Sequence, residues 1–547
     1  MIWRLFSLRR GAVLGIVAVG AAIALFGGSR AEARSEIAPY IEVQQVLEAE
    51  LDGGGDVLTY TAVAAGVDAR VKSRRVTAQI SYRYERRIPW KDNIIDEDVH
   101  SGLAQVRLEV APRALSIDAG AIAARSRQDP RGPAFGFSGA DNPNIAQIYG
   151  VYAGPTLATH AGPIAVNASY RLGYVKVDDH SLAGSDFPGG PLDRYESSTS
   201  HTINASVGMG PGALPFGWTV GAGYERETTK RLDQRYIGKY VRGDVVLPVS
   251  STFAITGGIG YEKIRASQDD FLRDAAGLPV VTPGGNLVAD KSKPRLLAYD
   301  QSGLIWDAGV IWRPSPRTEL TGRVGERYGG TTVVGTLKYQ INRNFAFSAF
   351  VYDGVTSFGR LLISDVSGLP AEFQVNNHGL NASLNGLGGC VVGKDPGTGA
   401  CLNDAFQSVS SSTFRNRGVG LLLSGGRGPW DLHIGAGYAR RKYLTPAGSV
   451  FLLHNVVDES AMIEAGLGRR LTRSSGLNFD AYASWFDTGI PGNGTVFSGG
   501  VTGTYYHRFL VDRLQGQTSV GIYTTDAGID DGTSTVAAAM LGLRYTF

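Results

Sequence analysis

The only two cysteines of the chain, Cys390 and Cys401, lie close together in the glycine-rich stretch GLGGCVVGKDPGTGACLNDAF. In a protein exported to an oxidising compartment, such a pair predicts a disulfide. Closing so short a loop would stabilise it by roughly 3 kcal/mol on the chain-entropy account. The alternative is a reactive or metal-binding pair, although no histidine stands nearby in a ligand spacing. The pair therefore favours a structural cross-link within one long loop.

The eight histidines form neither a metal-ligand spacing nor a Ser, His and acid arrangement. They are His100, His160, His180, His201, His378, His433, His454 and His507. Two acidic clusters, Asp96-Glu97-Asp98 and Asp526 with Asp530 and Asp531, fall in expected loops. Calcium binding is one interpretation of these clusters, and solvated loop charge is the commoner one. We therefore expect no enzymatic activity, no metal centre and no cofactor.

A further set of charged residues alternates with apolar residues along expected strands. On a barrel strand, the face opposite the apolar one is turned towards the lumen. The lumen-lining candidates are Arg83, Glu85, Arg107, Glu109, Arg317, Glu319, Arg323 and Lys338. Their mixed charge suits a hydrated solute such as a sugar, and it equally suits cross-strand ion pairs that only stabilise the wall. The sequence leaves both interpretations open.

The element that best explains this alternation is the last stretch, residues 533–547, which reads TSTVAAAMLGLRYTF. Every second residue from Phe547 back to Ala537 is apolar, which is the pattern of a strand with one face towards lipid. The ending resembles the C-terminal signature of bacterial outer-membrane barrels. That resemblance implies that Leu543, Tyr545 and Phe547 act as a signal to the barrel assembly machinery. Closure of the barrel should pair this strand with the first one, residues 38–51.

The rest of the chain repeats this pattern in alternating segments of about 10 to 15 residues. Short connections, such as Lys72-Ser73-Arg74 and Asn342-Arg343-Asn344, alternate with longer ones. Outer-membrane barrels have short periplasmic turns and long extracellular loops. The sequence therefore predicts an all-β fold, a closed antiparallel transmembrane β-barrel of about 22 strands, within a range of about 18 to 24. Residues 34–547 would form this single domain, with 358–411 as a long extracellular or lumen-folded loop that restricts the lumen.

The N-terminus predicts export. Arg4, Arg9 and Arg10 precede an apolar run, and Ala31-Glu32-Ala33 is a small-x-small cleavage pattern, so residues 1–33 indicate a signal peptide. Its removal takes away four Arg and one Glu, which brings the formal charge from +3 to 0. No basic surplus then remains to suggest a nucleic-acid partner. The short distance from residue 33 to the first strand leaves no room for a long N-terminal plug domain.

Residues 315–357, reading SPRTELTGRVGERYGGTTVVGTLKYQINRNFAFSAFVYDGVTS, contain a Pro-Arg-Thr turn and a strand that ends in Arg327-Tyr328. A tight turn and two alternating strands follow. This region resembles a family of outer-membrane barrel proteins associated with exopolysaccharide loci and the PEP-CTERM sorting system. The opening IAPYIEVQQVLEAEL is similar to the start of that family. The resemblance implies a role linked to surface polysaccharide.

We therefore expect a pore or conduit in the outer membrane of a Gram-negative bacterium, associated with exopolysaccharide export or display. The expected partners are outer-membrane lipid, the barrel assembly machinery and components of polysaccharide or envelope export. A nutrient porin and a non-conducting scaffold of the cell envelope are the alternatives.

Overall fold

The computed structural model describes residues 34–52, 57–90, 97–127, 145–178, 195–282, 287–375, 379–380, 389–406, 409–446, 454–489, 494–526 and 533–547. The predicted signal peptide lies outside the described residues, as do Asp96, Asp530, Asp531, His180 and His378. Among the described helices, none has the length and hydropathy to cross a membrane.

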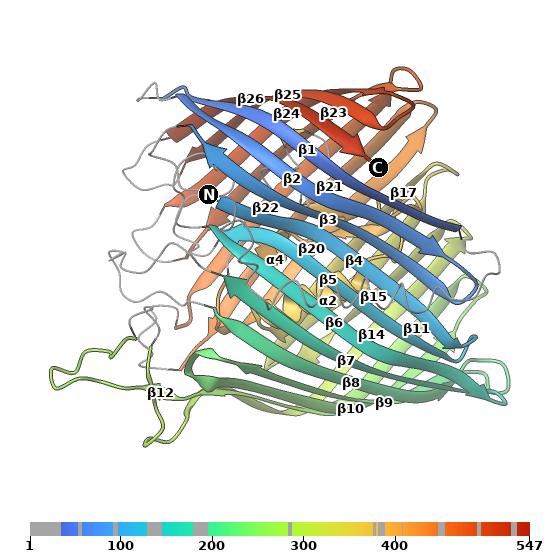
Figure 1. Cartoon of the computed structure of the whole chain (residues 1–547). Helices are drawn as coiled ribbons and strands as arrows, with labels where there is room; N and C mark the ends of the chain where they lie inside the picture. The colour runs from blue at the N-terminus through green and yellow to red at the C-terminus, as the bar shows by residue number, and fades with distance from the viewer. Residues whose placement is uncertain are drawn as a thin grey trace.

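The wall of the molecule is one sheet of 22 antiparallel strands, in which each strand pairs with its neighbours in the chain (Figure 1). The first half of the wall comprises β1 (Arg34–Glu50), β2 (Val57–Lys72), β3 (Val76–Pro89), β4 (Glu97–Ala111), β5 (Leu115–Arg127), β6 (Ile145–Ala161), β7 (Ile164–Asp178), β8 (Ser197–Met209), β9 (Gly217–Thr229), β10 (Gln234–Pro248) and β11 (Phe253–Gln268). The second half comprises β14 (Leu296–Ser315), β15 (Thr318–Arg327), β16 (Gly330–Gln340), β17 (Phe345–Thr356), β20 (Thr413–Arg427), β21 (Trp430–Leu444), β22 (Val457–Arg470), β23 (Ser475–Asp487), β24 (Thr495–Phe509), β25 (Leu514–Asp526) and β26 (Thr533–Thr546).

The first and last strands close the sheet into a barrel. β1 pairs with β26 from Tyr40 opposite Thr546 to Glu50 opposite Val536, and the backbone N–H of Phe547 donates to the carbonyl of Pro39 at 3.0 Å. Closure leaves no open sheet edge, so every wall strand has a partner on both sides. The predicted fold class, the strand number and the pairing of the two ends are confirmed.

The outer face of the wall is apolar because alternate residues point away from the lumen. On β26 the outward side chains Leu541 and Leu543 are exposed, whereas the inward side chains Ala538 and Met540 are buried in the barrel. The other strands repeat this order, with exposed outward residues such as Val241, Val324 and Trp306. The exposed apolar band is the surface that a bilayer covers.

The two rims differ in the length of their connections (Figure 1). One rim has short turns, such as residues 73–75 and 428–429, and holds the end of β26. The other rim has the longer loops, one of which contains the small hairpin of β12 (Asp270–Phe271) and β13 (Ala289–Asp290). A short connection on this rim, between β9 and β10, contains the 3₁₀ turn η1 (Arg231–Asp233). By the rule for outer-membrane barrels, the first rim is periplasmic and the second extracellular.

Between β17 and β20 the chain turns inward instead of forming a surface loop. Residues 357–412, the insertion, contain α2 (Phe358–Gly368), the hairpin of β18 (Cys390–Val392) and β19 (Gly399–Cys401), and α4 (Asn403–Phe406). The described parts of the insertion pack inside the barrel. Of the two placements predicted for this loop, the structure has the lumen-folded one.

Candidate functional site

The insertion reaches from the extracellular rim to the periplasmic rim. It begins at Ser357, directly after the extracellular end of β17. At the other rim, Glu372 forms an ion pair of 2.7 Å with Lys72, the last residue of β2. The backbone N–H of Gly397 donates to Ser424 Oγ at 2.8 Å, close to the periplasmic end of β20. The insertion therefore contacts the wall over the full height of the lumen.

Helix α2 is held by an apolar patch on the inner wall. Its side chains Phe358, Leu362, Ile363 and Val366 are buried in one cluster with inward-facing residues of β4 to β7. The wall residues are Leu103, Ile122, Ala124, Ala146, Ile148, Tyr152, Val175 and Val177. Burying four aliphatic or aromatic side chains contributes roughly 1.5–3 kcal/mol for each. This patch therefore fixes α2 on one side of the barrel.

The start of α2 is anchored by charge. Ser357 caps the helix by accepting a hydrogen bond from the backbone N–H of Arg360, and its hydroxyl donates to Glu227. Arg360 Nη1 lies 2.8 Å from Glu225, and the guanidinium stacks 3.5 Å from the ring centre of Tyr236. Because Arg360 is buried, each of these partners offsets part of its desolvation. Nearby carboxylates and Tyr236 outweigh burial and raise the pKa of Arg360 above its ordinary value, so it stays cationic.

Helix α4 is anchored to the opposite side of the barrel through Asp404, while its residues Ala405 and Phe406 lie in the apolar cluster around α2. Asp404 accepts hydrogen bonds from Tyr352 Oη and from Asn416 Nδ2, each at 2.8 Å, and pairs with Arg441 at 2.8 Å. Burial, followed by the neighbouring Asp404 carboxylate, raises the pKa of Asp365 on α2 well above its ordinary value. The neutral form of Asp365 avoids placing a second negative charge beside the Asp404 carboxylate, which Arg441 already neutralises.

The periplasmic part of the insertion is held by polar contacts. Gln105 Nε2 donates to the carbonyl oxygen of Val366 near the end of α2 at 2.7 Å. Glu372 lies 3.6 Å from Lys394 of the insertion in addition to its ion pair with Lys72. The hydrogen bond from Lys72, with help from Lys394, lowers the pKa of Glu372.

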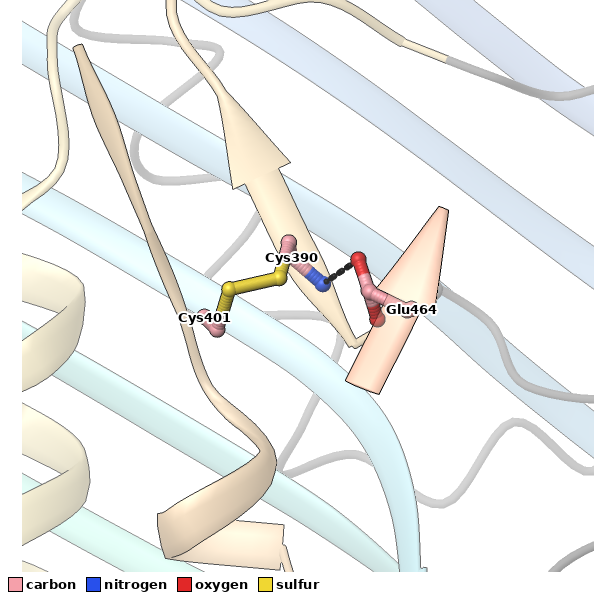
Figure 2. The surroundings of a disulfide bond; sticks show 3 residues. All are labelled: Cys390, Cys401 and Glu464. Atoms are coloured by element: carbon pink, nitrogen blue, oxygen red, sulfur yellow. Dashed lines mark hydrogen bonds between the residues drawn. A yellow bond between two sulfur atoms is a disulfide. The ribbon is translucent and has the colours of Figure 1, made fainter. Parts of the chain in front are cut away.

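The two cysteines cross-link the hairpin of the insertion. Cys390 and Cys401 stand opposite each other on β18 and β19 and form a disulfide, and the Cys390 N–H donates to Glu464 on β22 at 2.8 Å (Figure 2). A Cβ on Gly435 of β21 would lie 2.2 Å and 2.6 Å from the two sulfurs. A glycine is therefore required where the disulfide meets the wall.

The arrangement of Cys390, Cys401 and Glu464 does not support metal binding. Within the described ranges, the only group of His, Cys, Asp and Glu side chains close enough to share an ion is Cys390, Cys401 and Glu464. Because both sulfurs are in the disulfide, the thiolate donors that zinc or copper would need are consumed.

A polar cavity of about 300 Å³ lies between the tip of the hairpin and the periplasmic rim. Its lining includes Gln374 and Lys394 from the insertion and Arg343, Ser424 and Asp431 from the wall and its turns. The cavity is large enough to hold water or a small hydrophilic group beside the insertion.

Two of the predicted lumen residues, Arg83 and Glu85, are buried in a network of charges on β1 and β3. Arg83 pairs with Glu42 and lies 2.9 Å from Glu85, and Arg87 Nε lies 2.8 Å from the other oxygen of Glu85. All of these side chains are nearly inaccessible to solvent. For Arg83 and Glu85, the arrangement is that of an ion-pair ladder within the wall.

Arg323 belongs to a second network of ion pairs, which extends across a glycine of the intervening strand. Its Nη1 lies 2.6 Å from Asp244 on β10 and 3.2 Å from Asp307 on β14, and Arg242 pairs with the same two carboxylates. The strand between them contributes Gly258, where a Cβ would lie 2.2 Å from Arg242 Nη2. In contrast to the first network, these charged groups keep part of their solvent exposure, 32% for Arg323.

The other lumen candidates lie nearer the periplasmic rim. Arg107 pairs with Asp118 at 2.6 Å, and Glu319 pairs with Arg313 at 3.2 Å. Lys338 is exposed and stands opposite Glu319 in the register. Glu109 lies at the bulge between β4 and β5. Arg317 lies in the turn between β14 and β15, on the rim and not on a lumen-facing strand position.

The contacts of the insertion given above all lie on strands other than β14, β15 and β16. The inward residues of these strands include Arg313, Glu319, Arg323, Thr336 and Lys338. Thr336, Glu319, Arg313 and Lys338 are exposed although they face the lumen. We call this inner surface of β14 to β16 the open wall, because these lumen-facing side chains are exposed to solvent.

Sequence reasoning missed the apolar inner patch and the residues that clamp the insertion, such as Gln79 and Gln105. The signal for the patch was present: β5 and β6 carry apolar residues at both odd and even positions, as in AGAIAA and QIYGVYAG. When the residues on both faces of a barrel strand are apolar, we expect another apolar segment of the chain to pack against the inner face of that strand.

No family model and no curated protein matches the chain. Solved structures to which it is similar include the FrpB iron transporter from Neisseria meningitidis, F5-1 variant, at 11% identity and a TM-score of 0.47, covering 93% of this chain and 82% of that one. The ferric-catecholate import receptor Fiu from E. coli K12, open form, is similar at 10% identity and a TM-score of 0.46, covering 92% and 81%. BauA, the ferric preacinetobactin receptor from Acinetobacter baumannii, is similar at 11% identity and a TM-score of 0.44, covering 94% and 81%.

The wall itself gives the class of the protein. A closed sheet of 22 strands, an outward apolar face, an inward polar face and connections of unequal length on the two rims occur together here. These features are those of transmembrane barrels of the outer-membrane type. The chain is a β-barrel membrane protein with a lumen insertion.

Proposed function

We propose that this protein is an outer-membrane pore for hydrophilic molecules, that its lumen is narrowed by the insertion, and that it serves the export or surface display of exopolysaccharide. The observation that carries the proposal is the open wall, where lumen-facing charged side chains are solvated. A barrel with a purely structural role has no need of a hydrated inner surface.

The insertion acts as a fixed constriction in this proposal. It is bound to the wall by the apolar patch, by Arg360 and Asp404 near the extracellular half, and by Glu372 near the periplasmic rim. Both of its ends are also continuous with wall strands. Displacing the whole insertion would break all of these contacts at once. A solute therefore needs less free energy to pass beside the insertion, along the open wall, than to pass after displacing the insertion.

A saccharide fits the chemistry of this passage. The open wall offers cations, carboxylates and the hydroxyls of Thr321 and Thr336, which lie 2.8 Å apart. Sugars are hydrated, and their hydroxyls both donate and accept hydrogen bonds, so mixed polar groups suit them better than charge of one sign. The region that resembles the exopolysaccharide-associated family, residues 315–357, includes β15, β16 and β17 and so contributes to this wall.

A scaffold role is the second candidate, and the buried network around Arg83 favours it. Such a network stabilises the wall but cannot contact a solute. A third candidate, the uptake of a nutrient solute, uses the same open wall as polymer export.

The experiment that separates these roles is removal of the protein from the cell that produces it, followed by complementation with the full-length chain. Loss of surface polysaccharide that complementation restores supports export or display. Unchanged polysaccharide with loss of growth on a particular solute contradicts the polysaccharide role and supports nutrient uptake. A stoichiometric envelope partner that co-purifies with a nonconducting barrel supports the scaffold role.

A further inference from the structure

A group of cations without partners lies on the outer face of β9, β10 and β11, towards the extracellular rim. It consists of Arg226, Lys239, Lys263 and Arg265, and we call it the outer basic patch. The side chains point away from the lumen, because the residues two positions along the same strands, Val241 and Tyr261, belong to the exposed apolar band. All four cations are exposed.

The register brings these charges close together. Lys239 stands directly opposite Lys263, and Ile237 stands between Arg226 on one side and Arg265 on the other. With strands about 4.8 Å apart and about 3.3 Å per residue, the four positions fall within roughly 10 Å by 7 Å. Like charges directly opposite each other on one face of a sheet destabilise it. The patch is therefore unfavourable unless an anion lies against it.

No anion of the described chain neutralises the patch. None of the four cations forms an ion pair, hydrogen bond or ring contact with a described residue, and Asp300, opposite Arg265 in the register, makes no ion pair with it. Two outward cations elsewhere near this rim are paired: Arg86 with Asp98 at 3.0 Å and Arg440 with Glu459 at 3.1 Å. The outer basic patch differs from them because its four cations lie side by side within one small area.

The height of the patch identifies the layer of the membrane that it meets. Tyr224 lies on the same rung as Lys239, and Tyr261 lies one rung closer to the periplasm. Aromatic residues at the edge of the apolar band lie at the level of the lipid headgroups. The cations beside and above these tyrosines therefore lie among the headgroups of the outer leaflet.

We propose that the outer basic patch binds the phosphate groups of a glycolipid in the outer leaflet. Phosphate oxygens accept charge-assisted hydrogen bonds from several Lys and Arg side chains at once, which removes the repulsion between Lys239 and Lys263. The bound lipid lies against β9 to β11, and the neighbouring open wall begins at β14, so the lipid supports that side of the barrel from outside.

The test uses the purified full-length barrel in detergent, incubated with bis-phosphorylated lipid A or with its fully dephosphorylated form, and counts retained lipid by native mass spectrometry. The variant is K239Q/K263Q/R265Q. The matched control, R86Q/K176Q/R440Q, removes three outward cations that are paired with acidic neighbours. Heat-modifiable migration on gels establishes that each variant is a folded barrel.

We expect the unmodified barrel and the control to retain the phosphorylated lipid at least tenfold more than the dephosphorylated one, with retention falling as salt rises. The patch variant should lose this preference. Equal retention of the two lipids by the unmodified barrel, or an unchanged preference in the patch variant, would overturn the proposal. If the triple variant yields no folded barrel, the single variant R265Q is tested in its place, together with the salt dependence of lipid retention by the unmodified barrel. A weaker preference of R265Q for the phosphorylated lipid, with retention that falls as salt rises, supports the proposal. An unchanged preference, or retention that does not depend on salt, overturns it.

Discussion

Gln79 on β3 holds Phe373 of the insertion by both of its amide atoms: its Nε2 donates to the Phe373 carbonyl at 2.7 Å, and its Oε1 accepts from the Phe373 N–H at 3.0 Å. Both groups are buried. The two hydrogen bonds satisfy the backbone of an irregular segment inside a membrane protein, where an unpaired N–H or carbonyl is costly. They tie the insertion to the wall near the periplasmic rim.

Replacing Gln79 with Ala should loosen this part of the insertion while the wall stays folded. Each buried backbone group left unpaired costs about 1–3 kcal/mol, so the segment around Phe373 should open roughly tenfold more often or more. Hydrogen exchange of the Phe373 amide measures this opening. Q301A on β14, which is an inward position without a contact to the insertion, is the control. Equal exchange in Q79A and the unmodified protein would contradict the clamp.

Substitution of Gly435 should displace the cross-linked hairpin. The added methyl group of G435A would overlap both sulfurs of the disulfide, whereas the same methyl group in G437A would lie in ordinary contact, 3.7 Å from Met462. We expect faster proteolysis within residues 389–402 of G435A and little change in G437A. The same rate in both variants would show that the hairpin does not press on the wall at Gly435.

The docking of the insertion at the periplasmic rim should depend on pH through Glu372. The hydrogen bond from Lys72 lowers the pKa of Glu372 below its ordinary value of 4.5, so the docked state favours the carboxylate. The stabilisation is present in full above pH 4.5, declines as the pH falls below it and is lost once the pH is below the lowered pKa. Proteolysis of residues 369–375 should therefore accelerate below pH 4.5.

In E372Q this pH dependence should disappear, since the amide does not titrate. A pH response that is equally strong in E372Q would assign the effect to another group.

Deletion of Phe547 should reduce the yield of assembled barrel. The Phe547 N–H extends the pairing of β26 with β1 by its bond to Pro39, and the Phe547 ring packs edge-on against Tyr545 at 5.2 Å between centroids. Heat-modifiable migration of outer-membrane fractions measures the assembled fraction. A normal yield without Phe547 would count against its role as an assembly signal.

The wall could be predicted from the sequence because its signal is local. Alternation at residues 537–547 and 38–51 is readable within each strand, and the antiparallel order then follows from the short connections. The alternation also placed Arg83 and Arg323 on the inward face. Both side chains do lie on that face.

The sequence could not predict what these inward residues contact. Arg83 is buried beside Glu42 and Arg323 is partly solvated beside Asp244, yet each has the same local pattern around it. Gln79 and Phe373 are 294 residues apart, and an inward Gln looks the same whether it faces water or clamps a backbone. These contacts depend on the three-dimensional path of the insertion, which has no periodic signal of its own.

The conductance of the purified mature barrel in a planar bilayer tests the central claim most directly. The unmodified protein and a variant with residues 361–408 replaced by a short flexible linker are compared. A hydrated lumen narrowed by the insertion predicts stepwise conductance in the unmodified protein and larger steps in the variant. A variant that folds as a barrel, has lost the insertion and still does not conduct would contradict the pore.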